Sequence, residues 1–364
     1  MSIYKNLGQD DTTSFKTNLY EQIPVTGTII KDTYGTFPSE SNIKYFSNND
    51  HIDVYDYPYA SSSANFLFSM TAGKTTDSTG HDAVTEKELK NNVYRLFAQQ
   101  YVGYDTNQNV VPFNVSGVLN PADTWDPVKF TDAIFLNFSR VIMKDEIKKG
   151  SLRLTLGTGS FSNPFVDSHG TTTKVLSDAY VVANNPTTYR TNSPMGDYAF
   201  LQEGTQSATV PTETNNGFIF YDAGLIVLAA NTTNFGTQLT SGSGFSSFGA
   251  KTPSQALSTG SINDIVNGVR AHIDNIEFNN TTELNSTAYF CRLNHNEFNY
   301  SSNPSYTSAS QIVVKNNPSD PPVSYVTSVG LYSPDNQLLA VGKLSEPLKK
   351  TPANEFTLRL RLDY

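Results

Sequence analysis

The chain contains few residues whose types and spacing suit catalysis or metal binding. The densest group is FCRLNHNEFNYSSNPSY, residues 290–306, which holds the only cysteine, Cys291, and places His295 two residues before Glu297. On a strand the last two side chains would face the same side, where an imidazole beside a carboxylate binds a metal or relays a proton. No third ligand follows at a metal-like spacing. We therefore expect a hydrogen-bonded histidine at a loop or strand end.

A second group lies in HIDVYDYPYASSSANFLF, residues 51–68, where Asp53 and Asp56 stand among aromatic residues. Two carboxylates serve acid–base catalysis or hold a hard cation when they share a face. A spacing of three does not provide a shared face on an extended chain, and Pro58 breaks any helix. The stretch is therefore expected to form a structural turn with aromatic anchors.

Other reactive patterns are weaker. The GTGS sequence at residues 157–160 lacks the lysine and the following helix that a phosphate-binding loop requires. Cys291 has no organised histidine beside it in the sequence, which is typical of a small buried hydrophobic residue rather than a nucleophile. His81 follows a Gly/Ser/Thr-rich loop, where a solvated side chain is expected. The sequence thus predicts no catalytic residue, no metal site and no cofactor.

The composition favours β structure and buried protein surfaces. The chain has 364 residues and a formal charge of -9, from 25 Lys plus Arg against 34 Asp plus Glu, which indicates neither nucleic acid nor an anionic membrane as a partner. Charged residues make up only 16% and aromatic residues 12%, a balance found in strands and at interface cores. The first residues do not have the pattern of a secretory signal, and no apolar stretch is long enough for a membrane helix.

Alternating segments predict the strands that position these groups. EFTLRLRLDY, residues 355–364, places four apolar residues on one face, and SLRLTLGTGS, residues 151–160, turns Leu152, Leu154 and Leu156 inward. Two hairpins are expected, at residues 218–230 with both strands buried and at residues 325–344. The predicted fold class is mainly β, with an antiparallel β-sandwich or barrel-like sheets, two or three short packed helices and long loops.

Three helices are expected. The first covers residues 86–101 after a capping box of Thr85 and Glu88. The second lies near residues 261–275 with Ser261 as its cap and His272 at the surface or half-buried, and a short third helix is expected to run through residues 141–150. The apolar stripe of the first helix is expected to contain Leu89, Val93, Leu96, Phe97 and Tyr101.

The organisation predicted from these elements has three parts. Residues 1–30 form an extended N-terminal arm. Residues 31–175 form a β-rich region that includes the helix near 86–101. Residues 176–364 form a second β-rich region with the helix near 261–275, the terminal hairpin and the final strand.

A family resemblance joins several of these blocks. FCRLNHNEFNYSSNPSY, followed by YVTSVGLYSPDNQLLAVGKLSEPLKK and a closing strand, resembles virion structural proteins of large contractile-tailed bacteriophages of the marine and cyanophage myovirus type. The blocks YDYPYASSSANFLFSMTAG and IFLNFSRVIMKDEIKKGSLRLTLGTGS are similar to the same proteins. The resemblance implies a non-enzymatic subunit that is located in the virion after assembly in the host cytoplasm.

The implied role is assembly in the tail or baseplate region through β-edges, arms and aromatic contacts. Expected partners are other virion structural proteins and further copies of the chain as a homo-oligomer. Nucleic acid and membrane are not expected as partners. The candidate assembly contacts are Tyr55, Tyr57, Tyr59, Phe298, Tyr300, Tyr306 and Tyr332.

Three alternatives stay open. The chain could be a neck or capsid-vertex decoration protein of the same particle. It could be a receptor- or glycan-binding module, in which the Tyr-rich loops and the single Trp125 form a stacking platform. It could also be a metal-dependent hydrolase built on Asp53, Asp56 or His295.

Overall fold

The computed structural model describes most of the chain in several ranges. These are residues 4–24, 40–75, 84–113, 130–158, 173–178, 190–203, 216–236, 239, 251–301, 307–308, 311–312, 319 and 321–364. The chain divides into two compact units, a smaller one of Met1–Asn18 with Glu283–Tyr364 and a larger one of Leu19–Thr282. This division differs from the three ranges predicted from the sequence, because the first residues belong with the last ones.

The expected fold class is confirmed, since the protein is mainly β with antiparallel strands and few short helices. The described residues form no closed barrel. The larger unit contains the strands β2 (Ile43–Tyr45), β3 (Ile52–Tyr55), β4 (Phe66–Lys74), β5 (Asp132–Phe138), β6 (Glu146–Ile147), β7 (Arg153–Gly157), β8 (Thr173–Ser177), β9 (Arg190–Ser193), β10 (Gly196–Glu203), β11 (Gly217–Phe220) and β12 (Leu225–Ala229). Its helices are α1 (Val84–Tyr101), α2 (Arg140–Met143), α4 (Thr232–Phe235), α5 (Pro253–Thr259) and α6 (Ile262–His272), with a 3-10 turn, η2, at Glu40–Asn42.

The strands of the larger unit follow the order β13-β7-β8-β10-β11-β12-β5-β4-β3-β2. Strand β10 pairs with β8 at one end, where Gln202 lies opposite Ser177, and with β11 along its middle, where Tyr198 lies opposite Phe220. It therefore connects two sheet regions whose inner faces share one apolar core. The inward leucines predicted on β7 are fully buried there, together with residues of α6.

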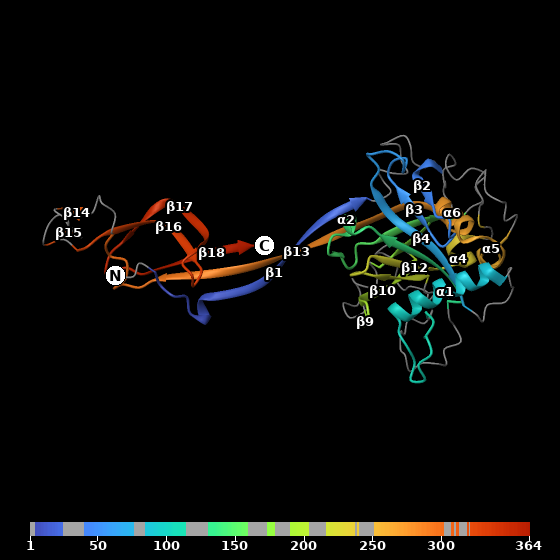
Figure 1. Ribbon diagram of the computed structural model, residues 1–364, viewed down its shortest axis with the longest axis horizontal. Helices are drawn as coiled ribbons and strands as arrows, with labels where there is room; N and C mark the ends of the chain where they lie inside the picture. Colours follow the sequence, from blue (N-terminus) through green and yellow to red (C-terminus); the bar gives the residue numbers. More distant parts are fainter. Residues whose placement is uncertain are drawn as a thin grey trace. The chain divides into compact units, whose positions relative to one another are not determined.

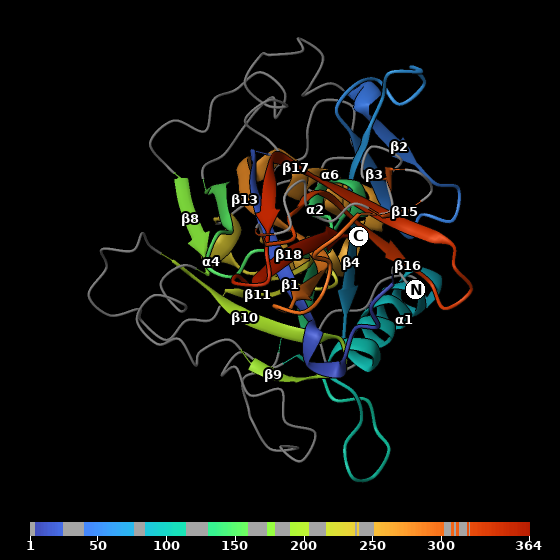
Figure 2. The same cartoon turned by 90° about the vertical axis from the view of Figure 1, so that its left-hand side faces the viewer.

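The opposite face of β4, β5 and β11 is covered by helix α1 (Figures 1 and 2). Its aromatic core includes Tyr94, whose hydroxyl donates to the carbonyl of Phe130 over 2.6 Å and accepts from the backbone N–H of Phe113 over 3.1 Å. Gly73 of β4 permits the close approach of the helix, because a Cβ at that position would lie 2.9 Å from the Cα of Tyr94. The long apolar strands of this unit are thus buried on both faces.

The helix predictions have mixed outcomes. Helix α1 forms, but it begins at Val84, so Thr85 lies inside it and is not its cap, and Leu96 is 64% exposed. Helix α6 forms as predicted with Ser261 as its N-cap, whose Oγ accepts from the backbone N–H of Asp264. The third helix is reduced to the single turn of α2, since Lys144 adopts a positive φ of 61° and ends it.

The two apolar runs predicted as buried strands are confirmed. Strands β11 and β12 form an antiparallel hairpin in which Phe220 lies opposite Leu225. Gly224 in the connecting turn has φ 64°, a left-handed conformation that suits glycine. Among the described residues, no helix has the length and apolar character needed to cross a membrane.

The smaller unit is built from long strands. Strands β1 (Thr12–Pro24) and β13 (Ile273–Leu293) contribute residues to both units, and the smaller one adds β14 (Thr307–Ser308), β15 (Gln311–Ile312), β16 (Ser324–Tyr332), β17 (Leu338–Lys350), β18 (Phe356–Asp363) and the 3-10 turn η1 (Gln9–Asp11). The predicted hairpin is confirmed as β16 and β17, and β18 pairs antiparallel with β13 (Figure 1). The alternation predicted for residues 355–364 is present, but its apolar face is only half-buried.

Candidate assembly surface

The β16–β17 hairpin presents apolar side chains to solvent. It forms a two-stranded sheet of its own, so neither of its outer edges pairs with another strand among the described residues. The exposed residues, called the hairpin surface below, are Tyr325, Tyr332, Leu338, Leu339 and Val341, with Leu339 at 67% exposure. Exposed apolar groups that follow one another on a hairpin mark a surface for another protein chain.

The backbone pairing explains which side chains face outward. Gly330 lies opposite Val341 and Tyr332 opposite Leu338, and residues in such pairs share a face. Gly330 leaves room for the two side chains at the turn, because a Cβ there would meet the ring of Tyr332 at 2.9 Å. Tyr4 extends this face, with its ring 4.9 Å from that of Tyr332 in an edge-on arrangement.

The inner face of the hairpin packs on β18. Leu331 is buried, and a Cβ on Gly342 would lie 2.8 Å from Leu360. In this unit the buried hydrophobic residues among those described are only Ala288, Leu293 and Leu331. A two-stranded hairpin is at best marginally stable in water, and three buried side chains add little apolar burial. The smaller unit is therefore short of a core.

The connection at residues 294–300 is organised by a lysine that the sequence did not single out. Lys350 is fully buried, and its ammonium donates to the carbonyls of His295 and Thr351 and to Oδ1 of Asn299, over 3.2, 2.9 and 2.8 Å. Burial lowers the pKa of Lys350, an effect opposed by Glu355 and Glu297. The stretch behaves as a shaped connection, and Lys350 satisfies its carbonyl groups.

The candidate catalytic pair in this connection is separated. His295 Nδ1 lies 3.1 Å from Oε1 of Glu355, whereas Glu297 forms a 2.5 Å ion pair with Lys5. The hydrogen-bonded histidine expected at a loop or strand end is confirmed, because His295 lies in a turn after β13 ends. Hydrogen bonding to Lys5 lowers the pKa of Glu297, and hydrogen bonding to His295 lowers that of Glu355. The alternative in which His295 and Glu297 pair with each other is not found, since each has a different partner.

Cys291 lies on β13 opposite Leu358 and is half-buried. Burial, and then the nearby charge of Asp11, raise the pKa of its thiol. A raised pKa disfavours the thiolate, which is the nucleophilic form. The environment of Cys291 therefore suits packing better than catalysis.

The other candidate side chains, Asp53, Asp56 and His272, form hydrogen bonds or close contacts with nearby protein groups. Asp53 accepts from the hydroxyl of Ser69 over 2.5 Å, and Asp56 accepts from the backbone N–H and side-chain amide of Asn65 over 2.6 and 2.7 Å. His272 is fully buried, contrary to the surface or half-buried position expected, with Nδ1 2.6 Å from the carbonyl oxygen of Gly157. Within the described ranges, no three residues among His, Cys, Asp and Glu are grouped as a metal site would require.

The aromatic residues predicted as assembly contacts lie in different units. Tyr55, Tyr57 and Tyr59 belong to the larger unit, where only Tyr59 is largely exposed, at 49%. Phe298, Tyr300 and Tyr332 belong to the smaller unit, where Tyr332 is exposed and the other two are half-buried. Tyr306, Trp125, His81 and the second half of the GTGS sequence fall outside the described residues.

Sequence reasoning missed most of the hairpin surface. Leu338, Leu339 and Val341 occur in QLLAV, an apolar run directly after a turn. Successive side chains on a strand point to opposite faces, so a run of apolar residues places at least one of them on the outer face of a two-stranded sheet. No family model, curated protein or solved structure matches the chain.

Proposed function

We propose that the chain is a non-enzymatic structural subunit that assembles through its smaller unit, with the hairpin surface as the main contact. The observation that carries this proposal is the combination of exposed Leu338, Leu339 and Val341 with a unit whose described residues include only three buried hydrophobic side chains. Association removes such apolar surface from water and contributes about 25 cal/mol for each Å² buried. The hairpin edges offer N–H and C=O groups to a strand of the partner.

Further copies of the same chain are the proposed first partner. A unit without a core of its own needs its partner as soon as it is synthesised, and another copy of the chain is present whenever the protein is made. Most soluble oligomers are symmetric assemblies of identical chains. Other structural proteins of the same particle then bind the oligomer. The proposal includes no cofactor, nucleic acid or membrane.

The particle in which we place the subunit is the virion of a large contractile-tailed bacteriophage. The family resemblance of residues 290–306 and 325–350 supports this assignment to the particle. Within the particle we favour the tail or baseplate over the neck or the capsid vertex. Exposed strand edges and aromatic contacts suit a subunit that holds its neighbours by addition of strands. Crosslinking mass spectrometry on intact particles tests the location, with crosslinks expected from the hairpin to tail or baseplate proteins.

The assembly role is tested by charged substitutions in the hairpin surface. Leu339→Asp with Val341→Asp is expected to weaken self-association at least about tenfold, because two carboxylates would have to be desolvated at the contact. The matched control is Val141→Asp, another exposed apolar residue, at 77% exposure in the larger unit. Sedimentation velocity over a range of concentrations measures the mass relative to the 40.0 kDa chain. A wild-type chain that stays monomeric, or a double variant that associates like the control, would refute the role.

A further inference from the structure

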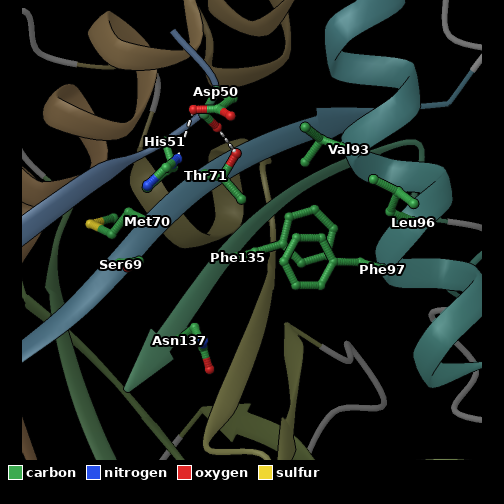
Figure 3. Close-up of a pocket in the computed structure, with 10 residues that line it drawn as sticks. All are labelled: Asp50, His51, Ser69, Met70, Thr71, Val93, Leu96, Phe97, Phe135 and Asn137. Atoms are coloured by element: carbon green, nitrogen blue, oxygen red, sulfur yellow. Dashed lines mark hydrogen bonds and ion pairs between the residues drawn. The ribbon is translucent and has the colours of Figure 1, made fainter. Parts of the chain in front are cut away.

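A cavity of about 240 Å³ opens on the larger unit between helix α1 and the sheet (Figure 3). It lies on the face of β4 and β5 that α1 covers, beside Val93, Leu96 and Phe97 in the second half of the helix. Its polar lining consists of Asp50, His51, Ser69, Thr71 and Asn137, and its apolar lining of Met70, Val93, Leu96, Phe97 and Phe135. A cavity that combines an apolar wall with a few convergent polar groups is the usual form of a small-molecule site.

The polar wall is held in place before any ligand arrives. Nδ1 of His51 donates to Oδ1 of Asp50 over 2.7 Å, and the imidazole stacks on Phe46 at 4.1 Å between ring centres. The hydroxyl of Thr71 donates to the backbone carbonyl of Asp50 over 2.5 Å (Figure 3). The hydroxyl of Ser69 is committed as a donor to Asp53. These bonds fix the side chains and leave mainly oxygen acceptors toward the cavity.

Asn137 supplies a further polar group. Its side chain is exposed and makes no hydrogen bond to another described residue, although its backbone is paired within the sheet. Asn137 lies at the end of the cavity opposite to Asp50 (Figure 3). A free amide both donates and accepts, so it suits a ligand that carries neutral hydroxyl groups.

The apolar wall is built from stacked rings. Phe97 of α1 lies parallel to Phe135 of β5, with 4.2 Å between ring centres and 9° between planes (Figure 3). Leu96 stands beside Phe97 and is largely exposed, so its side chain is accessible to a ligand in the cavity. This wall matches the C–H face of a sugar ring.

We infer that the cavity binds a single pyranose ring, either as a free sugar or as the terminal residue of a glycan. The hydroxyl groups of the ring donate to Asp50 and to the oxygens of Ser69 and Thr71, and one hydroxyl bonds to Asn137. The C–H face packs on Leu96 and Phe97. The volume is small for a ligand site, so it accommodates one ring rather than a longer saccharide. The inference concerns the larger unit and does not depend on the proposed assembly role.

The test is saturation-transfer difference NMR on the full chain with a panel of probes. The panel contains glucose, galactose, mannose and N-acetylglucosamine, their methyl α- and β-glycosides, and ethanolamine as an amine that pairs with carboxylates alone. We expect at least one pyranose to bind with a Kd of ~1 mM, as a ligand of this size normally does. Binding of a methyl glycoside identifies a terminal glycan residue, whereas binding of only the free sugar identifies a monosaccharide.

Two substitutions at exposed positions connect the signal to the cavity without affecting the core. Asn137→Ala and Leu96→Ser are each expected to raise the Kd at least about fivefold. The matched control is Tyr104→Ala, which removes an exposed aromatic residue of the same unit outside the cavity and is expected to leave the Kd unchanged. The inference is overturned if no pyranose binds, if ethanolamine is the only ligand, or if both cavity variants bind like the wild type.

Discussion

Strands β7 and β18 both pair with β13, one in the larger unit and one in the smaller, and their environments differ. Leu154 of β7 lies opposite Ile276 and is fully buried, whereas Leu358 of β18 lies opposite Cys291 and is half-buried. Both strands alternate apolar and polar residues. The pattern is the same, but among the described residues the apolar face is fully buried only in the larger unit.

This difference shows that alternation identifies a face without identifying what covers it. In the larger unit, α6 and neighbouring strands close the core over β7. In the smaller unit, the inner side of the β16–β17 hairpin covers β18 only in part, and the outer side carries Tyr332 and Leu339 into solvent. The described residues of the larger unit enclose an apolar core, whereas those of the smaller unit leave apolar side chains exposed.

The largest expected effect comes from truncating the matched leucines. Leu154→Ala is expected to destabilise the larger unit by about 3 to 4 kcal/mol, since it leaves a cavity in a close-packed core. Leu358→Ala is expected to cost about 1 kcal/mol in the monomer, because its side chain is already half in water. Hydrogen exchange with mass spectrometry, which reports each unit separately, measures both changes. Equal losses would mean that the smaller unit has a closed core after all.

The buried carboxyl group of Asp178 makes the stability of the larger unit depend on pH. Asp178 accepts hydrogen bonds from the hydroxyl of Tyr221 and from the N–H groups of Gly150 and Leu152, over 2.7, 2.7 and 3.0 Å. Burial outweighs these bonds and raises its pKa to about 6. The folded state therefore binds the proton more tightly than the unfolded chain, so this group stabilises folding below about pH 4 and loses that contribution as pH rises through 6.

We expect Asp178 to increase the free energy of unfolding of the larger unit by roughly 2 to 3 kcal/mol when the pH is lowered from 7 to 4. Urea unfolding of the wild type and of Asp178→Asn at several pH values checks the effect. In the variant this part of the pH dependence should be absent. The raised pKa would be contradicted if the difference in unfolding free energy between the wild type and Asp178→Asn did not increase from pH 7 to pH 4.

Substitution of Lys350 is expected to have an intermediate effect on stability, confined to the smaller unit. Replacement by Met keeps the length of the side chain but removes the donor to the carbonyls of His295 and Thr351 and to Asn299. We expect a loss of about 1 to 2 kcal/mol in that unit, since these groups are left without their partner. Hydrogen exchange should rise at residues 294–300 while α6 keeps its protection. Lys343→Met, at an exposed position of the same strand, is the control.

The smallest effect is expected at the exposed acids of the smaller unit. The pKa values of Glu297 and Asp363 are lowered, mainly by hydrogen bonds from Lys5 and Ser286. Their contributions are present above pH 4.5 and are lost on acidification, which is the opposite sign to Asp178. Glu297→Gln should therefore cost less than about 1 kcal/mol at pH 7. Thermal unfolding of the variant and the wild type at pH 7 and pH 4 measures this cost. A larger loss of stability at pH 4 than at pH 7 would contradict the lowered pKa of Glu297.

Much of the fold was predictable because it depends on local patterns. The alternation of residues 152–156 and 356–362, the turn at Ser333–Asn336 and the cap at Ser261 all form as the sequence indicates. The short helix expected through residues 141–150 failed because its periodicity competes with strand pairing, and β6 forms there against β13.

The sequence by itself determined that the chain is mainly β, that it has an amphipathic helix at α6 and that it ends in a hairpin and a strand. Only the tertiary structure decided that the first residues join the last ones in a separate unit, that Lys350 and Asp178 are buried, and that the apolar hairpin remains exposed. The physical reason is that side-chain periodicity is a property of neighbouring residues. Burial depends on which distant segments pack on each face, and that is set by contacts far apart in the chain.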